Sequence, residues 1–332
     1  MLKLFHRLCL LGTLLALCVV VLGAWVRLSN AGLGCPDWPG CYGHLTVGQA
    51  VENSHLANEA YPDRPLEAGK AFKEMLHRYL AASLGLLILV IAAFAVANRR
   101  DPAQPWRLPA FLVLLVMFQG LLGMWTVTLL LKPLFVVAHL LGGLTTTAML
   151  WWLAVRVDGA TRDAGEPGLR RWAVAGLVVL ALQIALGGWV SSNYAAFACP
   201  DFPTCQASMW PEMDFRDAFV LWRGLGIDYE GGVLDHPARV AIHVTHRIGA
   251  VLTALLLGCV AWMAFHRGPT RAVRASGAIL ALVLAVQLLL GPAMVLTQLP
   301  LGLATAHNGV AALLLLATVA LLRLLWPPAR RH

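Results

Sequence analysis

The chain contains eight runs of 18 or more mainly apolar residues, and this feature constrains its fold more than any other. A helix of that length crosses the hydrocarbon core of a bilayer. The chain is 59% hydrophobic and only 13% charged, whereas soluble domains average roughly 25% charged residues. We therefore predict an all-α integral membrane protein with eight transmembrane helices, at residues 9–27, 73–97, 107–130, 134–156, 172–192, 241–265, 273–297 and 301–326.

The first run has some character of a secretory signal peptide, because Lys3 and Arg7 precede a leucine-rich stretch. No clear small-x-small cleavage site follows it. The run also has a counterpart at residues 172–192 in the repeat described below. We therefore expect it to be retained as the first membrane helix.

Lysine and arginine are divided unevenly between the two sides of this predicted membrane protein. The termini and the short loops on their side hold 15 of the 25 lysines and arginines but only four of the 17 acidic residues. Because cytoplasmic loops carry an excess of Lys and Arg, we expect both termini to be cytoplasmic. The two long loops then lie on the outer side of the inner cell membrane. The net charge of +8 reflects this topology and does not indicate a nucleic-acid partner.

The two parts of the chain repeat one another. Residues 23–41, GAWVRLSNAGLGCPDWPGC, align with residues 187–205, GGWVSSNYAAFACPDFPTC, at an offset of 164. Further markers follow in the same order at offsets of 168 or 169: His77 with His246, Gln119 with Gln287, Gly123 with Gly291, and His139 with His307. This repeat predicts two four-helix bundles of the same topology, at residues 1–156 and 172–332, joined by a cytoplasmic linker at 157–171.

Four histidines fall inside predicted membrane helices, two in each half: His77, His139, His246 and His307. Each lies one to two turns from the outer end of its run, so we expect all four at similar depth. A polar side chain inside a membrane is costly and points to function. Imidazoles on facing helices of a bundle are suited to holding haem iron. A role in packing alone would explain one such histidine more readily than four. A zinc site is a weaker candidate, because neither pair has a third close ligand.

The halves differ at one position beside these histidines. Glu74 precedes His77 by three residues, so both lie on one helix face, and the second half has His243 at that position. A carboxylate near a metal centre can orient a ligand, move protons or stabilise a developing cation. The alternative is an acid at the favourable end of a helix dipole. Arg78, Arg247 and His243 are candidates for propionate contacts, and the arginines could instead reach lipid phosphates.

Two cysteine pairs lie in the predicted outer loops, Cys35 with Cys41 in CPDWPGC and Cys199 with Cys205 in CPDFPTC. Disulfides persist on the oxidising side of the membrane. Each pair is either a staple that holds its loop over the helix ends or a thiol pair that reacts with a substrate or redox partner. Neither has the C-x-x-C spacing of thioredoxin-like centres. The remaining cysteines are expected to pack inside membrane helices: Cys9, Cys18 and Cys259.

Taken together, these features resemble the haem A synthase family. The resemblance spans essentially the whole chain. It is carried by the eight helices in two halves, by EMLHR at residues 74–78 and VTHR at residues 244–247, by His139 and His307, and by the CPDWPGC loop. Because both long outer loops carry a cysteine pair, the chain is similar to the bacterial subset of the family with that feature.

The resemblance implies an oxidoreductase that converts the ring D methyl group of haem O to a formyl group, by two oxidations and loss of water. The product would be haem A for a terminal oxidase. His246 and His307 would ligate a resident haem b that passes electrons, while His77 and His139 would flank haem O. Glu74 would be the catalytic acidic residue. The Cys35–Cys41 pair would brace the substrate site or join its redox chemistry.

The expected partners follow from the same resemblance. They are membrane lipid, the enzyme that produces haem O, an electron donor that the sequence does not identify, and further copies of the chain in a homo-oligomer.

Other functions fit parts of the sequence. A dihaem cytochrome b-type electron carrier often places its haems near opposite membrane faces, whereas these four histidines are expected near one face. A non-catalytic haem-binding or delivery protein would not need Glu74. A prenyltransferase that makes haem O needs Asp-rich loops for magnesium diphosphate, and the four acids on the cytoplasmic side are scattered.

Overall fold

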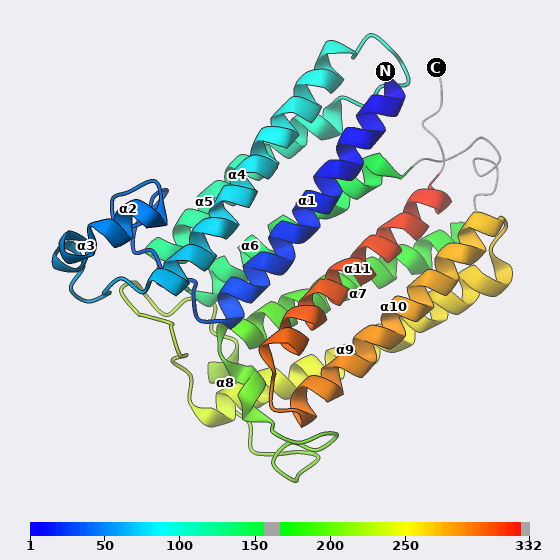
Figure 1. Ribbon diagram of the computed structural model, residues 1–332. Coiled ribbons are helices and arrows are strands. Elements are labelled where there is room, and N and C mark those ends of the chain that lie inside the picture. Colours follow the sequence, from blue (N-terminus) through cyan, green and yellow to red (C-terminus); the bar gives the residue numbers. More distant parts are fainter. Residues whose placement is uncertain (156–166, 327–332) are drawn as a thin grey trace.

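The computed structural model describes residues 1–155 and 167–326, in which eight long helices run side by side (Figure 1). All eight are long and apolar enough to cross a membrane. They are α1 (Leu2–Leu28), α4 (Ala68–Ala97), α5 (Arg107–Thr128), α6 (Pro133–Ala154), α7 (Pro167–Ser192), α9 (His236–Arg267), α10 (Arg271–Leu296) and α11 (Leu301–Leu325). Short helices in the long loops are α2 (Val47–Glu52), α3 (Ser54–Ala60), η2 (Ala195–Ala198) and α8 (Phe215–Ala218). The predicted all-α fold with eight spans is confirmed.

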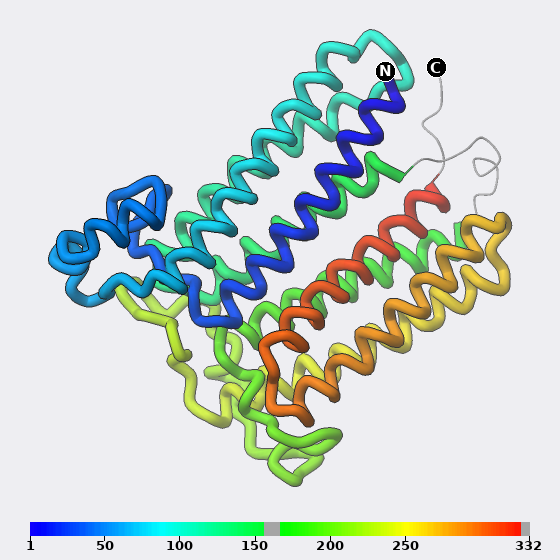
Figure 2. The backbone as a smooth tube through the Cα atoms, in the orientation of Figure 1, coloured from blue at the N-terminus to red at the C-terminus, as the bar shows by residue number. Residues whose placement is uncertain are grey.

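The long helices form two rings of four. In the first ring α1 packs on α4, α4 on α5, α5 on α6, and α6 on α1; in the second, α7, α9, α10 and α11 pack in the same order. The rings meet where α11 packs on α1 and α6, and where α6 packs on α7. We call the end where α1 begins and α11 ends the terminal end, and the end with loops 29–67 and 193–235 the loop end (Figure 2).

Several contacts between the rings join residues 164 positions apart. Such contacts arise near a two-fold axis, where a residue meets its own counterpart, and 164 is the offset of the sequence repeat. The pairs are Arg27 with the Ser191 carbonyl (2.7 Å), Tyr194 with Asn30 (3.2 Å) and Arg64 with Asp228 (2.5 Å). They agree with the predicted repeat, although the division into halves at 156 and 172 stays a prediction.

Three helices begin five residues before their predicted spans: α4 at Ala68, α7 at Pro167 and α9 at His236. Their first turns are polar and so fall outside a window chosen for apolar content. Proline in the first turn of α7 and α9 suits a helix start, because that position needs no N–H donor. Residues 167–171 of the predicted linker therefore belong to α7, while residues 157–166 lie outside the described residues.

Tight packing is concentrated toward the terminal end of both rings. Fully buried residues there include Phe5, Ile88 and Leu150 in the first ring and Leu257 and Leu321 in the second. Toward the loop end, most residues of α1 and α6 that face the ring are only half-buried. The two rings are therefore closed at one end and less densely filled at the other.

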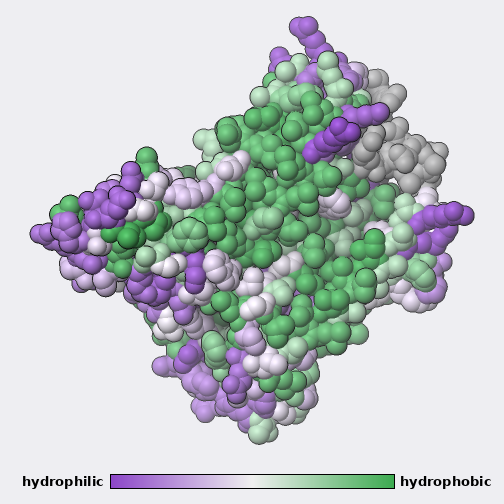
Figure 3. Space-filling model, viewed as in Figure 1, coloured by the Kyte–Doolittle hydropathy of each residue, from purple (hydrophilic) through white to green (hydrophobic). Residues whose placement is uncertain are grey.

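The outer surface matches a protein surrounded by lipid. On the visible face, hydrophobic residues cover the middle of the bundle and hydrophilic residues gather at its two ends (Figure 3). Cys9 packs in the first-ring core, as expected, but Cys18 and Cys259 are exposed. The expectation was wrong for those two because the lipid-facing side of a membrane helix is as apolar as its packed side.

Candidate haem sites at the loop end

The four predicted histidines lie in the loop-end part of the two rings. His77 is nine residues into α4 and His246 ten residues into α9, while His139 and His307 are each six residues into α6 and α11. His77 lies close enough to His139, and His246 to His307, for their charges to interact. The helices of each pair are opposite members of their ring. The structure thus brings the predicted pairs together, both toward the same end.

Each histidine ring lies against a glycine of a neighbouring helix. A Cβ atom at Gly23 would lie 2.9 Å from Cε1 of His77, and one at Gly187 would lie 3.2 Å from Cε1 of His246. Gly123 and Gly291 lie similarly beside His139 and His307, at 3.5 and 3.8 Å. These glycines make room for the imidazoles, and at Gly23 any side chain would displace the ring.

Glutamines contact the second-ring histidines. Gln183 Nε2 donates to His246 Nδ1 at 3.1 Å, which leaves Nε2 of that imidazole for another partner. Gln287 Nε2 lies 3.2 Å from His307 Nε2. In the first ring, both amide atoms of Gln119 are buried without a hydrogen-bond partner among the described residues. The second-ring site is therefore the more completely hydrogen-bonded of the two.

Glu74 joins the first ring to the Cys35–Cys41 loop. The Glu74 side chain is only 6% exposed. One carboxylate oxygen accepts from the Cys35 backbone N–H at 2.9 Å, and the other pairs with Arg78 at 2.5 Å. Arg78 also donates to three loop carbonyls, those of Asp37, Pro39 and Gly40. Glu74 is thus a buried carboxylate held by fixed donors one helical turn before His77.

The second ring holds its cysteine loop in a related way. Arg247 donates to four loop carbonyls, those of Cys199, Asp201, Pro203 and Thr204. His243 is buried, and its Nδ1 donates to the Ala195 carbonyl at 3.1 Å. Within the loop, a hydrogen bond from the Thr204 hydroxyl lowers the pKa of Asp201. Both arginines therefore bind loop carbonyls here, and a contact with haem propionates stays a prediction for them and for His243.

Gly34 allows the first loop to approach α4 closely. A Cβ atom at Gly34 would lie 2.6 Å from the Lys70 carbonyl carbon and 2.8 Å from the Ala71 nitrogen, and backbone cannot give way as a flexible side chain can. The absent side chain is what lets the Cys35 N–H reach Glu74.

We expect Gly34→Ala to lower the melting temperature of the purified protein, because the loop must move off α4 and break the Cys35–Glu74 hydrogen bond. The expected cost is about 1–3 kcal/mol. Thermal unfolding in detergent measures it. Gly69→Ala is the matched control, because a Cβ there meets nothing within 4 Å and alanine favours a helix. An unchanged melting temperature for Gly34→Ala would contradict the packing described.

The two predicted disulfides are present, Cys35–Cys41 and Cys199–Cys205. All four cysteines are buried. Directly after each bridge, a backbone hydrogen-bond pair closes the turn, between Cys41 and His44 and between Cys205 and Ser208. The loops are therefore built alike, which favours the structural interpretation of the cysteines without testing the redox one.

Replacing Cys199 and Cys205 together by serine is expected to destabilise the protein by about 2 kcal/mol, since the bridge closes a short loop and restricts the unfolded chain. A lower melting temperature in detergent is the expected observation. Cys259→Ser, which removes an exposed thiol, should leave the melting temperature unchanged. Equal melting temperatures for the double variant and this control would show that the bridge does not stabilise the fold.

The long loop of the second ring reaches across the loop end of the first ring. Arg64 pairs with both Asp228 and Glu230, at 2.5 and 3.0 Å. Lys132 is only 2% exposed; its Nζ donates to the Gly224 carbonyl and lies 3.6 Å from the centroid of the Trp222 ring. We call residues 222–230 the strap. It fastens the two rings together at the end that carries the histidines.

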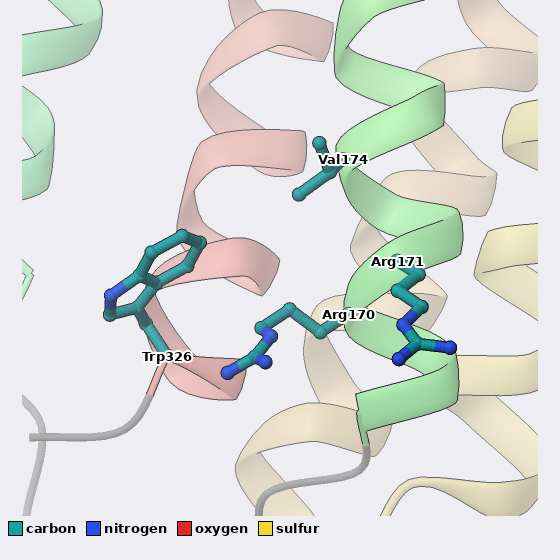
Figure 4. A pocket seen from close by; sticks show the side chains of 4 residues that line it. All are labelled: Arg170, Arg171, Val174 and Trp326. Atoms are coloured by element: carbon teal, nitrogen blue, oxygen red, sulfur yellow. The ribbon is translucent and has the colours of Figure 1, made fainter.

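A cavity of about 340 Å³ lies away from these residues, at the terminal end between α7 and α11. Arg170, Arg171, Val174 and Trp326 line it, with Arg170 directed toward Trp326 (Figure 4). None of the predicted site residues lines this cavity. In the described parts of the chain, no three His, Cys, Asp or Glu side chains are grouped to bind a bare metal ion.

Sequence reasoning missed several residues of the site. Gly23 and Gly187 open the aligned repeat segments, so the signal was present, but only the structure shows the histidine rings against them. Gln183 has no glutamine counterpart at residue 19, where the sequence has Val19. A self-comparison therefore could not find it.

Comparison with known proteins agrees with the geometry. A model of the family described as "Cytochrome oxidase assembly protein" matches residues 6–319. A haem A synthase of Shewanella oneidensis is 45% identical over 324 residues, which cover 96% of this chain and 95% of that protein. Haem A synthases of Sphingopyxis alaskensis and Allorhizobium ampelinum are each 30% identical, covering 93% and 92% of this chain and 88% and 86% of theirs. The similarity extends along nearly the whole chain.

Proposed function

Since the chain belongs to the haem A synthase family, we propose that it oxidises the ring D methyl group of haem O to a formyl group and so makes haem A. The first ring binds the substrate haem O between His77 and His139. The second ring holds a resident haem b through His246 and His307. The main support for placing the substrate in the first ring and haem b in the second is the buried carboxylate of Glu74, which only the first ring has at this position.

The residues present fit a porphyrin held between two imidazoles. Nδ1 of His77, His139 and His307 is buried without a hydrogen-bond partner in the described residues. All four imidazoles are only half-buried, in the less densely filled part of each ring. Each imidazole lies against a glycine of a neighbouring helix, whose missing side chain makes room for the ring. Imidazole nitrogens of this kind are iron ligands in helical bundles.

In the second ring, Gln183 lies beside Nδ1 of His246 and holds the orientation of its ring. For Nε2 to ligate iron, Nδ1 must carry the proton, so Gln183 would turn its amide to accept from the Nδ1–H through Oε1, which is buried without a partner among the described residues. His307 needs Gln287 to move aside before its Nε2 can do the same. A bound haem b would supply one-electron redox chemistry there. His243 fixes the α9 end by its hydrogen bond to Ala195.

In the first ring, Glu74 takes the chemical role. Its carboxylate lies one turn before His77, buried and oriented by the Cys35 N–H and the Arg78 guanidinium. A carboxylate in that position can accept a proton released as the substrate methyl group is oxidised, or stabilise positive charge developing there. The second ring has an imidazole instead, already committed to a loop carbonyl.

The two alternative functions are less well supported. A dihaem electron carrier that moves charge across the bilayer needs its haems near opposite faces, whereas all four histidines lie toward the loop end. A haem-delivery protein has no use for an oriented, buried carboxylate beside one site only. Contacts with the haem O-producing enzyme, an electron donor and further copies of the chain remain proposals, as does the cytoplasmic placement of both termini.

Haem extraction tests the proposed function directly. Cells supplied with haem O, with and without this protein, are extracted and their haems are separated by chromatography. We expect haem A only when the protein is present. A protein that accumulates in the membrane while haem O remains unconverted would refute the proposal.

A further inference from the structure

Arg27 is a half-buried cation at the junction of the two rings. It lies in the last turn of α1, and its Nη2 donates to the Ser191 carbonyl of α7 at 2.7 Å. Its guanidinium carbon lies 4.3 Å from the centroid of the Tyr194 ring, and the Tyr194 hydroxyl donates to Asn30. The Arg27 side chain is therefore held between the rings.

Arg27 has no acidic partner in the described part of the chain. A guanidinium has five N–H donors; within residues 1–155 and 167–326, Arg27 uses one of them, and its Nε is buried without an acceptor. Arg78 and Arg247, by contrast, have their donors engaged by a carboxylate or by loop carbonyls. A half-buried charge is costly unless it is paired. Arg27 is thus placed to receive an anion that the described part of the chain does not supply.

The position of Arg27 along the helices identifies that anion. Gly23, one turn earlier on α1, lies against His77 of the first ring. Ser191, which Arg27 binds, is one turn after Gly187 on α7, and Gly187 lies against His246 of the second ring. Arg27 therefore stands one helical turn from the wall of each histidine site. An anion bound there adjoins both sites.

Resting on the proposed function, we propose that Arg27 binds a propionate carboxylate of a haem at the ring junction and is a positioning residue shared by the two sites. A planar guanidinium binds a carboxylate with two parallel hydrogen bonds. This gives to Arg27 the role that the sequence suggested for Arg78 and Arg247. A lipid phosphate has the same anionic chemistry, but the position between two histidine sites favours the porphyrin.

The test compares two forms of one ligand. Full-length protein purified in detergent without haem is titrated with iron protoporphyrin IX and with its dimethyl ester, in which both carboxylates are blocked. Wild-type protein should bind the ester roughly 10–100-fold more weakly, as expected for loss of a charge-assisted hydrogen bond. Arg27→Gln should bind the free acid weakly and lose most of this difference. Arg223→Gln is the control, because it removes a loop cation paired with Asp217 and should keep the wild-type difference.

The outcomes separate the possibilities. If blocking the carboxylates weakens binding equally in wild-type protein and in Arg27→Gln, the inference is overturned. A dependence on Arg27 that vanishes when phosphatidylglycerol is added to the micelles assigns the residue to lipid phosphate, and also overturns it. If Arg27→Gln does not fold, Arg27→Lys is used instead, because lysine keeps the charge without the planar guanidinium. Its loss of affinity for the ester should be smaller than that of wild-type protein. A loss equal to that of wild type counts against the proposal. Wild-type protein that takes up neither form overturns the proposed function as well.

Discussion

Glu74→Gln should reduce haem A formation by roughly 10²–10⁴-fold, the range for loss of a general acid or base, while the haem b spectrum of the purified protein stays unchanged. Glutamine has nearly the same size and keeps an oxygen that can accept from the Cys35 N–H, so the loop should stay in place. It loses the negative charge that pairs with Arg78 and that can take a proton. Chromatography of extracted haems and an absorption spectrum provide the two measurements.

Glu67→Gln is the matched control for this substitution. Glu67 directly precedes α4, is largely exposed and pairs with Lys70, so the same chemical change is made seven residues earlier in the chain. Haem A formation should be normal in this variant. Normal haem A formation by Glu74→Gln would refute the catalytic role, and a loss of haem b in that variant would show that the residue is structural.

Under the proposed function, removing either second-ring histidine should remove the resident haem b. In His246→Ala or His307→Ala, we expect bound haem b to fall from about one per chain to near zero, because an axial iron ligand is lost. His77→Ala and His139→Ala should retain haem b but make no haem A. Haem content per purified protein, measured as the pyridine haemochrome, distinguishes these results.

His236→Ala is the control for the histidine series. His236 is exposed at the first residue of α9 and contacts Gln206 in the loop, outside both rings. Its replacement should leave haem content unchanged. Full haem b occupancy without His246 or His307, or its loss without His77, would reverse the assignment of the two rings.

Much of the fold was predictable because bilayer thickness dictates helix length. Eight apolar runs gave eight spans, and the errors occurred at polar helix starts such as that of α4, where hydropathy carries no information. The histidine pairing followed from the repeat, since equivalent positions in two similar bundles occupy equivalent places.

The partners of the charged residues were not predictable in this way. Arg78 and Arg247 adjoin the histidines in sequence, yet they bind loop carbonyls, because the direction of a long side chain depends on how the loop folds over the helix. The contacts of Gln183 and Arg27 depend on the packing of helices distant in sequence. Such contacts are absent from any local pattern.

The strap has a consequence for how a substrate as large as haem O can arrive. Toward the terminal end, Trp151 of α6 donates to the Leu316 carbonyl of α11; at the opposite end, Arg64 and Lys132 bind the strap. With fastenings at both ends, the two rings cannot part like a hinged clamshell. Under the proposed function, haem O would instead pass sideways between helices of the first ring, directly from the surrounding lipid. Its entry then depends on how easily neighbouring helices separate.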